Sequence, residues 1–327
     1  MSVSLIITVK NESTAIQRLL ESSAAQTRAP DEIVIVDGGS ADNTLEILRD
    51  YVTRLPLKII SMPGANISQG RNAAIRAATG GIICSTDAGV RLDKNWVEEL
   101  VKPLAGISPS VIHPPSSVDI VSGFFIPDPV GVFEIALAAT TLPALADIRP
   151  EKFLPSSRSI AFKKLAWEKV GGYPEWLDYC EDVIFDFALR AAGFRFAFAP
   201  RAVAHFRPRK NLGAFFKQYY FYARGDGKAN LFFKRHLIRY ATYLVAIPLV
   251  LVLFLLGFSF LGVAFLVLGF LIMFFTPYKR LHAMPSTWLE KLCASVWIPI
   301  VRVTGDIAKM IGYPVGAMWR WQNRRRA

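Results

Sequence analysis

The sequence predicts an α/β protein in which a mostly parallel sheet is flanked by helices and is followed by a C-terminal transmembrane helical hairpin and an amphipathic helix. Two observations support this fold class. Within the first 90 residues, short apolar runs alternate with segments of helical pattern, which is typical of a parallel sheet with crossover helices. Residues 240–276 then contain no charged side chain, and this run exceeds the ~20 residues that one helix needs to cross a bilayer.

The alternation defines the expected elements in order. Strands are expected at 3–9, 33–36, 57–61 and 81–86, with helices at 13–26, 43–54 and 68–79. Residues 33–36 are Ile-Val-Ile-Val, as in a strand that is buried on both faces. Further along, strands are expected at 118–126, at 194–199 and just before His205, with helices at 133–139, 163–170 and 183–192.

Two of the expected strands end in an aspartate. Asp37 follows the strand at 33–36 and precedes Gly38 and Gly39, which permit a sharp turn, and Asp87 follows the strand at 81–86. Because the carboxyl ends of parallel strands lie at one edge, where open α/β sheets bind ligands, we expect both carboxylates to face one crevice. The alternative for Asp37 is that it only caps the turn after its strand.

The charge is distributed unevenly along the chain. Residues 1–200 carry a net charge of −4, and residues 201–327 carry +16. As one helix the uncharged run would be about 55 Å long. Gly257, Ser259 and Gly262 lie near its middle, so two short spans joined by a tight turn there are expected. Basic residues on both sides of the hairpin predict that its ends, and the N-terminal domain, lie on the cytoplasmic side of the inner membrane. Anionic lipids are the expected partner of these basic residues, and nucleic acid is not.

Several function classes are disfavoured by what the sequence lacks. It contains neither G-x-G-x-x-G nor G-x-x-x-x-G-K-[ST], the patterns of dinucleotide and phosphate-loop sites. The three cysteines, Cys84, Cys180 and Cys293, have no metal or redox spacing, which is consistent with a reducing compartment. We expect no signal peptide, because Met1 and Ser2 lead directly into the first strand.

A series of motifs resembles the membrane-anchored bacterial type of family 2 glycosyltransferases, which have a Rossmann-like GT-A fold. The matching segments lie in the family's order within about residues 3–225, and they are residues 8–12 (TVKNE), 36–44 (VDGGSADNT), 70–72 (GRN), 86–89 (TDAG), 158–162 (RSIAF), 170–173 (VGGY), 181–182 (ED) and 204–205 (AH). This resemblance implies a nucleotide-diphospho-sugar donor and a role in cell envelope polysaccharide biosynthesis.

The resemblance also implies roles for individual residues in binding the donor. Thr8 and Asp37 match positions that hold the nucleobase and ribose, and Glu12 lies in the same nucleotide-binding motif. Arg71 matches a basic position near the nucleotide, where its guanidinium can hold the diphosphate or the base. Arg224 is a further candidate for the diphosphate, and a contact with lipid headgroups is its alternative.

The metal site is where the sequence departs from the family. Asp87 matches the first acid of the Asp-x-Asp motif, but the second acid is replaced by Gly89. His205 lies where relatives often have a histidine, and imidazole is an acceptable ligand for Mn²⁺. A divalent cation, Mn²⁺ or Mg²⁺, bound by Asp87 and His205 is therefore expected. The alternative for His205 is a structural histidine that follows a strand.

The expected catalytic base is Asp182, with Glu181 beside it. Inverting transfer needs a group that takes the proton of the acceptor hydroxyl, and a positioned carboxylate performs this step. Glu181 is expected to orient the loop or to hydrogen-bond the acceptor. Alternatively, both acids only complement the dipole of the helix that begins here.

Three domains are therefore expected: a cytoplasmic GT-A-like catalytic domain at 1–230, a transmembrane hairpin at 231–280, and an interfacial helix with a basic tail at 281–327. The predicted function is inverting transfer of a sugar to a lipid-linked or membrane-proximal acceptor, with a divalent metal or Arg71 assisting the diphosphate leaving group. The alternative is a non-catalytic, membrane-anchored protein that binds nucleotide or nucleotide-sugar as the partner of a glycan synthase. Retention of Glu181 and Asp182 favours the enzyme.

Overall fold

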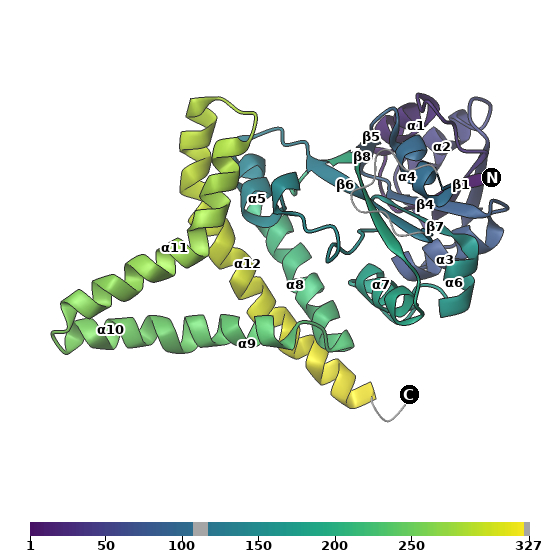
Figure 1. Ribbon diagram of the computed structural model, residues 1–327. Helices are drawn as coiled ribbons and strands as arrows, with labels where there is room; N and C mark the ends of the chain where they lie inside the picture. Colours follow the sequence, from purple (N-terminus) through teal and green to yellow (C-terminus); the bar gives the residue numbers. More distant parts are fainter. Residues whose placement is uncertain (107–116, 324–327) are drawn as a thin grey trace. The chain divides into compact units, whose positions relative to one another are not determined.

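The computed structural model describes residues 1–106 and 117–323 (Figure 1). Two compact units make up the chain: Met1–Asp128 with Leu145–Arg207, and Pro129–Ala144 with Pro208–Ala327. This division does not follow the expected boundaries at 230 and 280. Two helices from within the first 230 residues, α5 (Val132–Thr141) and α8 (Leu212–Ala229), belong to the second unit. Part of the expected basic tail, Arg324-Arg325-Arg326, lies outside the described residues.

The first unit contains a mixed sheet with the strand order β3-β2-β1-β4-β7-β6-β8-β5. Its strands are β1 (Val3–Val9), β2 (Glu32–Asp37), β3 (Leu57–Ser61), β4 (Ile82–Asp87), β5 (Val90–Leu92), β6 (Ile120–Pro127), β7 (Ile160–Lys163) and β8 (Phe196–Phe206). Strands β1 to β4 pair in parallel, as the sequence predicts. Strand β7 runs antiparallel to both β4 and β6, so the sheet changes direction next to the end of β4.

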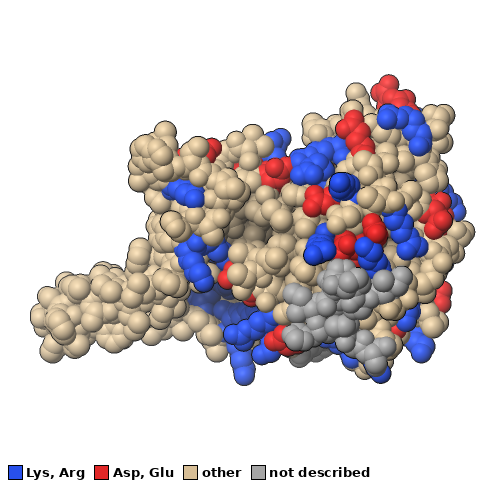
Figure 2. Space-filling model, turned by 45° about the horizontal axis from the view of Figure 1, so that its top comes forward, with Lys and Arg blue, Asp and Glu red and all other residues tan. Residues whose placement is uncertain are grey.

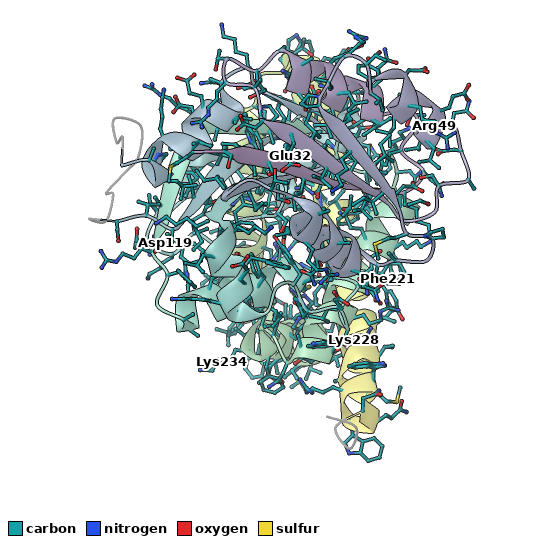
Figure 3. All side chains as sticks on the ribbon, turned by 90° about the vertical axis from the view of Figure 1, so that its right-hand side faces the viewer. Glu32, Arg49, Asp119, Phe221, Lys228 and Lys234 are labelled. Carbon is teal, nitrogen blue, oxygen red and sulfur yellow. The ribbon has the colours of Figure 1, made fainter. Side chains whose placement is uncertain are left out.

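Helices cover both faces of this sheet (Figure 1). One face packs against α1 (Ile16–Ala24), α2 (Thr44–Asp50) and α4 (Trp96–Leu104), and the other against α3 (Ile67–Ala77), α6 (Lys164–Val170) and α7 (Glu181–Ala191). The two layers of apolar side chains explain why β1, β2 and β4 are apolar on both faces. Glu32, labelled in Figure 3, lies at the start of β2. It accepts hydrogen bonds from Ser4 Oγ at 2.6 Å and from Thr79 Oγ1 at 2.7 Å, so it connects β2 to β1 and to the segment between α3 and β4.

Several elements differ from the expectation: α4, β5 and β7 were not expected, and α2 and β8 differ in extent. Helix α2 ends at Asp50 instead of residue 54. The two strands expected around residues 194–205 are one continuous strand, β8, that includes Pro200. Its register against β6 shifts between Ser122 and Phe124, so Pro200 lies at an irregularity. Proline lacks a backbone N–H, and such an irregularity is where a strand tolerates it.

The second unit is helical. Besides α5 and α8 it contains α9 (Phe233–Ala241), a π-helical segment (Thr242–Ala246), α10 (Ile247–Leu255), α11 (Ser259–Ala283) and α12 (Trp288–Asn323). The turn between α10 and α11 contains Gly257 at φ 81°, which confirms the predicted position. Helix α12 runs through most of the segment 281–327, which was expected to contain an interfacial helix and a basic tail.

Two helical stretches, Phe233–Leu255 and Ser259–Ala283, are long and apolar enough to cross a bilayer. Only 6% and 11% of their most apolar 18-residue windows are buried, so their side chains are not the core of this unit. The hairpin shows no charged residue on its visible surface between its two ends (Figure 2). An exposed apolar surface of this kind marks contact with a membrane or another protein.

Helices α8 and α12 approach each other closely through glycines. A Cβ atom on Gly227, Gly312 or Gly316 would lie 2.0–2.2 Å from a backbone oxygen of the facing helix. Lys228, labelled in Figure 3, lies over the ring of Trp319 with its Nζ 4.7 Å from the ring centroid. Small residues thus let these backbones meet, as they do in membrane helix pairs.

Candidate active site

The ends of β2, β1 and β4 form a continuous edge of the sheet. Val9 pairs with Asp37 on one side of β1, and Thr8 pairs with Asp87 on the other. Successive side chains of a strand point to opposite faces. Asp87 and Thr8 are therefore on the face of α3 and α7, and Asp37 is on the face of α1 and α2. Both aspartates lie at this edge, as expected, but their side chains point to opposite faces of the sheet.

Asp37 organises the turn that follows β2. It is fully buried, and its carboxylate accepts hydrogen bonds from Gly39 N at 3.1 Å, from Ser40 N at 3.1 Å and from Ser40 Oγ at 2.5 Å. Gly39 has φ 88°, where an L side chain would be strained. The contacts of Asp37 in this structure are therefore those of a residue that caps the turn after its strand, which was the alternative to ligand binding.

The loop that follows β1 carries Glu12 to the same edge. Glu12 N donates to Thr44 Oγ1 at 2.8 Å, which joins this loop to the start of α2. Its Oε2 lies 3.9 Å from the point that a Cβ on Gly89 would occupy. Thr8, also on β1, lies against α3, because a Cβ on Gly70 would approach Thr8 Cγ2 to 2.8 Å. Thr8 thus pairs with Asp87 in the sheet, and Glu12 lies near Gly89.

Arg71 joins Asp87, at the end of β4, to the acids at the start of α7. Its Nη2 donates to Asp87 Oδ1 at 3.0 Å and its Nη1 to Glu181 Oε1 at 2.5 Å. The side chain is only 4% exposed, and its guanidinium lies over the ring of Tyr173. Burial by itself lowers the pKa of Arg71, but Glu181 and Asp87 raise it above the ordinary value. Arg71 is therefore charged and has both terminal nitrogens engaged.

Asn72, the next residue of α3, holds the segment before α7 in place. Its Oδ1 accepts from Trp167 Nε1 at 3.0 Å and from Tyr173 N at 2.9 Å, and its Nδ2 donates to Tyr173 O at 2.8 Å. Gly172 has φ 81°, and a Cβ there would lie 2.7 Å from Asn72 Oδ1. This packing requires glycine at 172 and fixes the segment that leads into Glu181.

Helix α7 begins with the two candidate catalytic acids. Cys180, directly before them, is in the left-handed conformation at φ 64°. Burial raises the pKa of Glu181 to about 7, helped by the negative charge of Asp182 and opposed by Arg71. Burial also raises the pKa of Asp182 above its ordinary value, while Arg71 opposes this rise. The helix dipole does not keep these pKa values low, because desolvation is the larger effect.

The two residues that were expected to bind a metal, Asp87 and His205, are both paired with other side chains in this structure. Asp87 Oδ1 is paired with Arg71, and Asp87 Oδ2 lies 3.3 Å from Arg158 Nε. His205 Nε2 is hydrogen-bonded to Asp93 Oδ1 at 2.9 Å, as in its structural alternative. In residues 1–106 and 117–323 no group of three or more His, Cys, Asp or Glu side chains is arranged to hold a metal ion. Both oxygens of Asp87 are thus paired with arginines, and Gly89 offers no second carboxylate, so the described residues contain no preformed site for a divalent cation.

The structure also brings forward residues that received no role from the sequence. Arg158 contacts Asp87, which is 71 residues away in the chain. Asp93 contacts His205, which is 112 residues away. Arg158 is part of the RSIAF motif, which was the only available signal. Arg224 belongs to α8 of the second unit, where its guanidinium lies 4.7 Å from the centroid of the Phe221 ring.

Comparisons with known proteins agree with this fold. Residues 4–130 match the family model described as Glycosyl transferase family 2. The succinoglycan biosynthesis protein ExoA of Rhizobium meliloti is 27% identical over 239 residues, which are 68% of this chain and 68% of that protein. A mannosyltransferase of Pyrobaculum calidifontis, solved with GDP-Man and Mn²⁺, has a TM-score of 0.54 at 20% identity, over 97% of this chain and 86% of the other. This likeness confirms the GT-A-like fold.

A further relative matches over a shorter region. Validoxylamine A glucosyltransferase of Streptomyces hygroscopicus subsp. limoneus is 30% identical over 114 residues, which are 34% of this chain. The chain spans only 25% of that protein's length.

Proposed function

We propose that this chain, whose residues 4–130 match the model of glycosyltransferase family 2, is an inverting glycosyltransferase. Its donor is a nucleotide-diphospho-sugar, and its acceptor is lipid-linked or lies close to a membrane. The observation that carries this proposal is the bridge that Arg71 makes between Asp87, at the end of β4, and Glu181, at the start of α7. The bridge holds the acids of α7 next to the sheet edge where the donor binds.

Asp182 is the proposed general base. Its carboxyl is next to Glu181 in the first turn of α7, and its raised pKa brings it closer to the range where a base works at neutral pH. Glu181 is held by Arg71 and positions the loop. Thr8 and Glu12 form the nucleoside side of the site, at the end of β1 and in the loop that follows it, and the buried Asp37 holds the turn after β2 in place.

The transfer step follows from these positions. The acceptor hydroxyl oxygen attacks C1 of the sugar from the face opposite the diphosphate, and its proton passes to Asp182. The bond between C1 and the β-phosphate oxygen breaks, and its electron pair leaves with the nucleoside diphosphate. The configuration at C1 is inverted, and the negative charge that appears on the diphosphate must be offset by a neighbouring cation.

The proposed location is the cytoplasmic face of the inner membrane, with the two apolar helices spanning the bilayer. Their side chains are exposed, and basic residues flank the hairpin on both sides, at Lys234 and Arg235 and at Lys279 and Arg280. Such flanks favour the cytoplasmic side and anionic lipid. After carbonate washing, the chain should remain in the membrane pellet, and recovery in the supernatant would contradict this location.

The activity is tested by nucleoside diphosphate release from the purified full-length protein in detergent. UDP-, GDP- and dTDP-sugars are supplied in turn, with and without a membrane lipid extract as the source of acceptor. We expect release from one donor, and we expect the lipid extract to increase it. Release from none of the three donors, while a nucleotide still binds, would favour the alternative, a non-catalytic partner of a glycan synthase.

A further inference from the structure

The cation that offsets the diphosphate charge can be assigned from the two arginines at Asp87. Arg71 is 4% exposed and both of its Nη groups are engaged, one by Glu181 and one by Asp87. To reach a ligand it would have to abandon a buried carboxylate, which is costly. Arg158 is more accessible, with 19% of its side chain exposed. The accessible cation at the end of β4 is therefore Arg158.

The backbone of Arg158 is fixed next to β4. Its carbonyl oxygen accepts a hydrogen bond from Thr86 Oγ1 at 2.8 Å, which ties it to the residue before Asp87. The next residue, Ser159, accepts from Trp96 Nε1 at 2.8 Å and donates to Ala202 O at 3.1 Å. Both bonds are buried, so the segment that carries Arg158 is held by the core and not by solvent-exposed contacts.

The guanidinium of Arg158 is oriented by Asp87 and by two aromatic rings, of which that of Phe125 has its centroid 5.5 Å from the guanidinium carbon. Its carbon lies 4.1 Å from the centroid of the Phe206 ring, and its Nε lies 3.3 Å from Asp87 Oδ2. In the part of the chain that the structure describes, neither of its Nη groups has a hydrogen-bond acceptor. The Phe206 ring covers one face of the guanidinium, and Asp87 pairs with its Nε. The edge that carries the two Nη groups is therefore available to bind a planar or tetrahedral anion.

We propose that the two Nη groups of Arg158 bind the diphosphate of the donor, and that this contact replaces the divalent cation. The inference rests on the proposed function and deepens it. In the family's motif the second acid holds the metal, and here that position is Gly89, which has no carboxylate. As the bond from C1 to the β-phosphate oxygen breaks and the electron pair moves onto that oxygen, the guanidinium of Arg158 offsets the new charge. The proton of the acceptor hydroxyl passes to Asp182, so charge and atoms balance without a further reactant.

The test compares the binding of nucleoside diphosphate and monophosphate of the same base. Full-length protein in detergent is titrated in the presence of EDTA with UDP and UMP, GDP and GMP, and dTDP and dTMP. The variants are Arg158→Gln and Arg158→Lys. Arg54→Gln is the matched control, because Arg54 also lies over an aromatic ring, that of Tyr51, but contacts neither α7 nor Asp87.

In EDTA, the wild-type protein should bind the diphosphate of one base at least tenfold more tightly than its monophosphate. Arg158→Gln should lose at least tenfold in affinity for the diphosphate and leave the affinity for the monophosphate unchanged. Arg158→Lys should fall between the two, and Arg54→Gln should equal the wild type. Unchanged monophosphate binding also shows that the variant is folded.

Two results would overturn the proposal. One is an unchanged diphosphate affinity in Arg158→Gln, and the other is a diphosphate preference that EDTA abolishes in the wild type and that Mn²⁺ or Mg²⁺ restores. Neither result would affect the proposed transfer activity, because nucleotide would still bind. If no diphosphate of the three bases binds to the wild type, the proposed function itself fails.

Discussion

Arg71→Met tests whether this arginine holds the charge of Glu181 in the folded protein. The substitution keeps an apolar stem of similar length and removes the guanidinium that contacts both Glu181 and Asp87. Without it, Glu181 becomes protonated in the folded state, because a buried carboxylate without a partner is costly. The free energy of unfolding that Arg71→Met loses through the Glu181 charge therefore cannot exceed the free energy of protonating Glu181 at the pH of the experiment.

That limit depends on pH in a way that can be calculated. With Arg71 present, the pKa of Glu181 is about 7, so at pH 6 the residue is already mostly protonated and little charge pairing is lost. At pH 8 the carboxyl is mostly ionised, and protonating it costs on the order of 1 kcal/mol. The free energy of unfolding lost in Arg71→Met should therefore be larger at pH 8 than at pH 6, by on the order of 1 kcal/mol.

The assay is urea unfolding of full-length protein in detergent at pH 6 and pH 8, followed by tryptophan fluorescence. Arg76→Met is the matched control, since Arg76 is on the same helix but is 56% exposed, and its pairing with Glu175 at 3.7 Å is an exposed one. Exposed pairs of this kind contribute ~0–1 kcal/mol. An equal loss at both pH values in Arg71→Met would refute the role of Arg71 as the partner of the Glu181 charge.

Two further predictions concern pH and helix packing. Because the pKa of Glu181 is raised in the folded state to about 7 from 4.5, its contribution to stability is fully present below pH 4.5 and is lost as the pH rises through 7. The stability of Glu181→Gln relative to wild type should thus increase from pH 5 to pH 8 in thermal unfolding, and a constant difference would contradict the raised pKa. In Gly316→Ala the new Cβ would lie 2.0 Å from Arg224 O and 2.7 Å from Lys228 N, so α8 and α12 must separate, at a cost of ~1–3 kcal/mol. Gly269→Ala, with nothing within 4 Å, is its control and should not lower the melting temperature; equal effects of the two would argue against the close packing.

The sequence was informative about features that depend on short-range patterns. The strands β1 to β4 and their parallel pairing follow from apolar runs and crossover lengths, and the turn at Gly257 follows from one glycine in an uncharged run. The common edge that carries Asp37 and Asp87 follows from the same topology. Those predictions need no knowledge of how distant segments pack.

Other features depend on contacts between distant segments, and the sequence did not predict them. Arg71 and Glu181 are 110 residues apart, and their pairing depends on how α3 and α7 pack on one face of the sheet. The orientation of Asp37 and Asp87 toward opposite faces depends on register, which a single residue would reverse. The pairing of Asp87 with Arg158 depends on the antiparallel insertion of β7 beside β4, which breaks the pattern of the first four strands.

The central claim, that Asp182 is the base of a sugar transfer, is tested most directly by kcat for nucleoside diphosphate release in Asp182→Asn. Asparagine keeps the shape of the side chain but cannot accept the proton of the acceptor hydroxyl. We predict a fall in kcat of ~10²–10⁴-fold, with the dissociation constant of the nucleoside diphosphate unchanged. A kcat equal to that of the wild type, measured with the same donor and lipid extract, would contradict the claim.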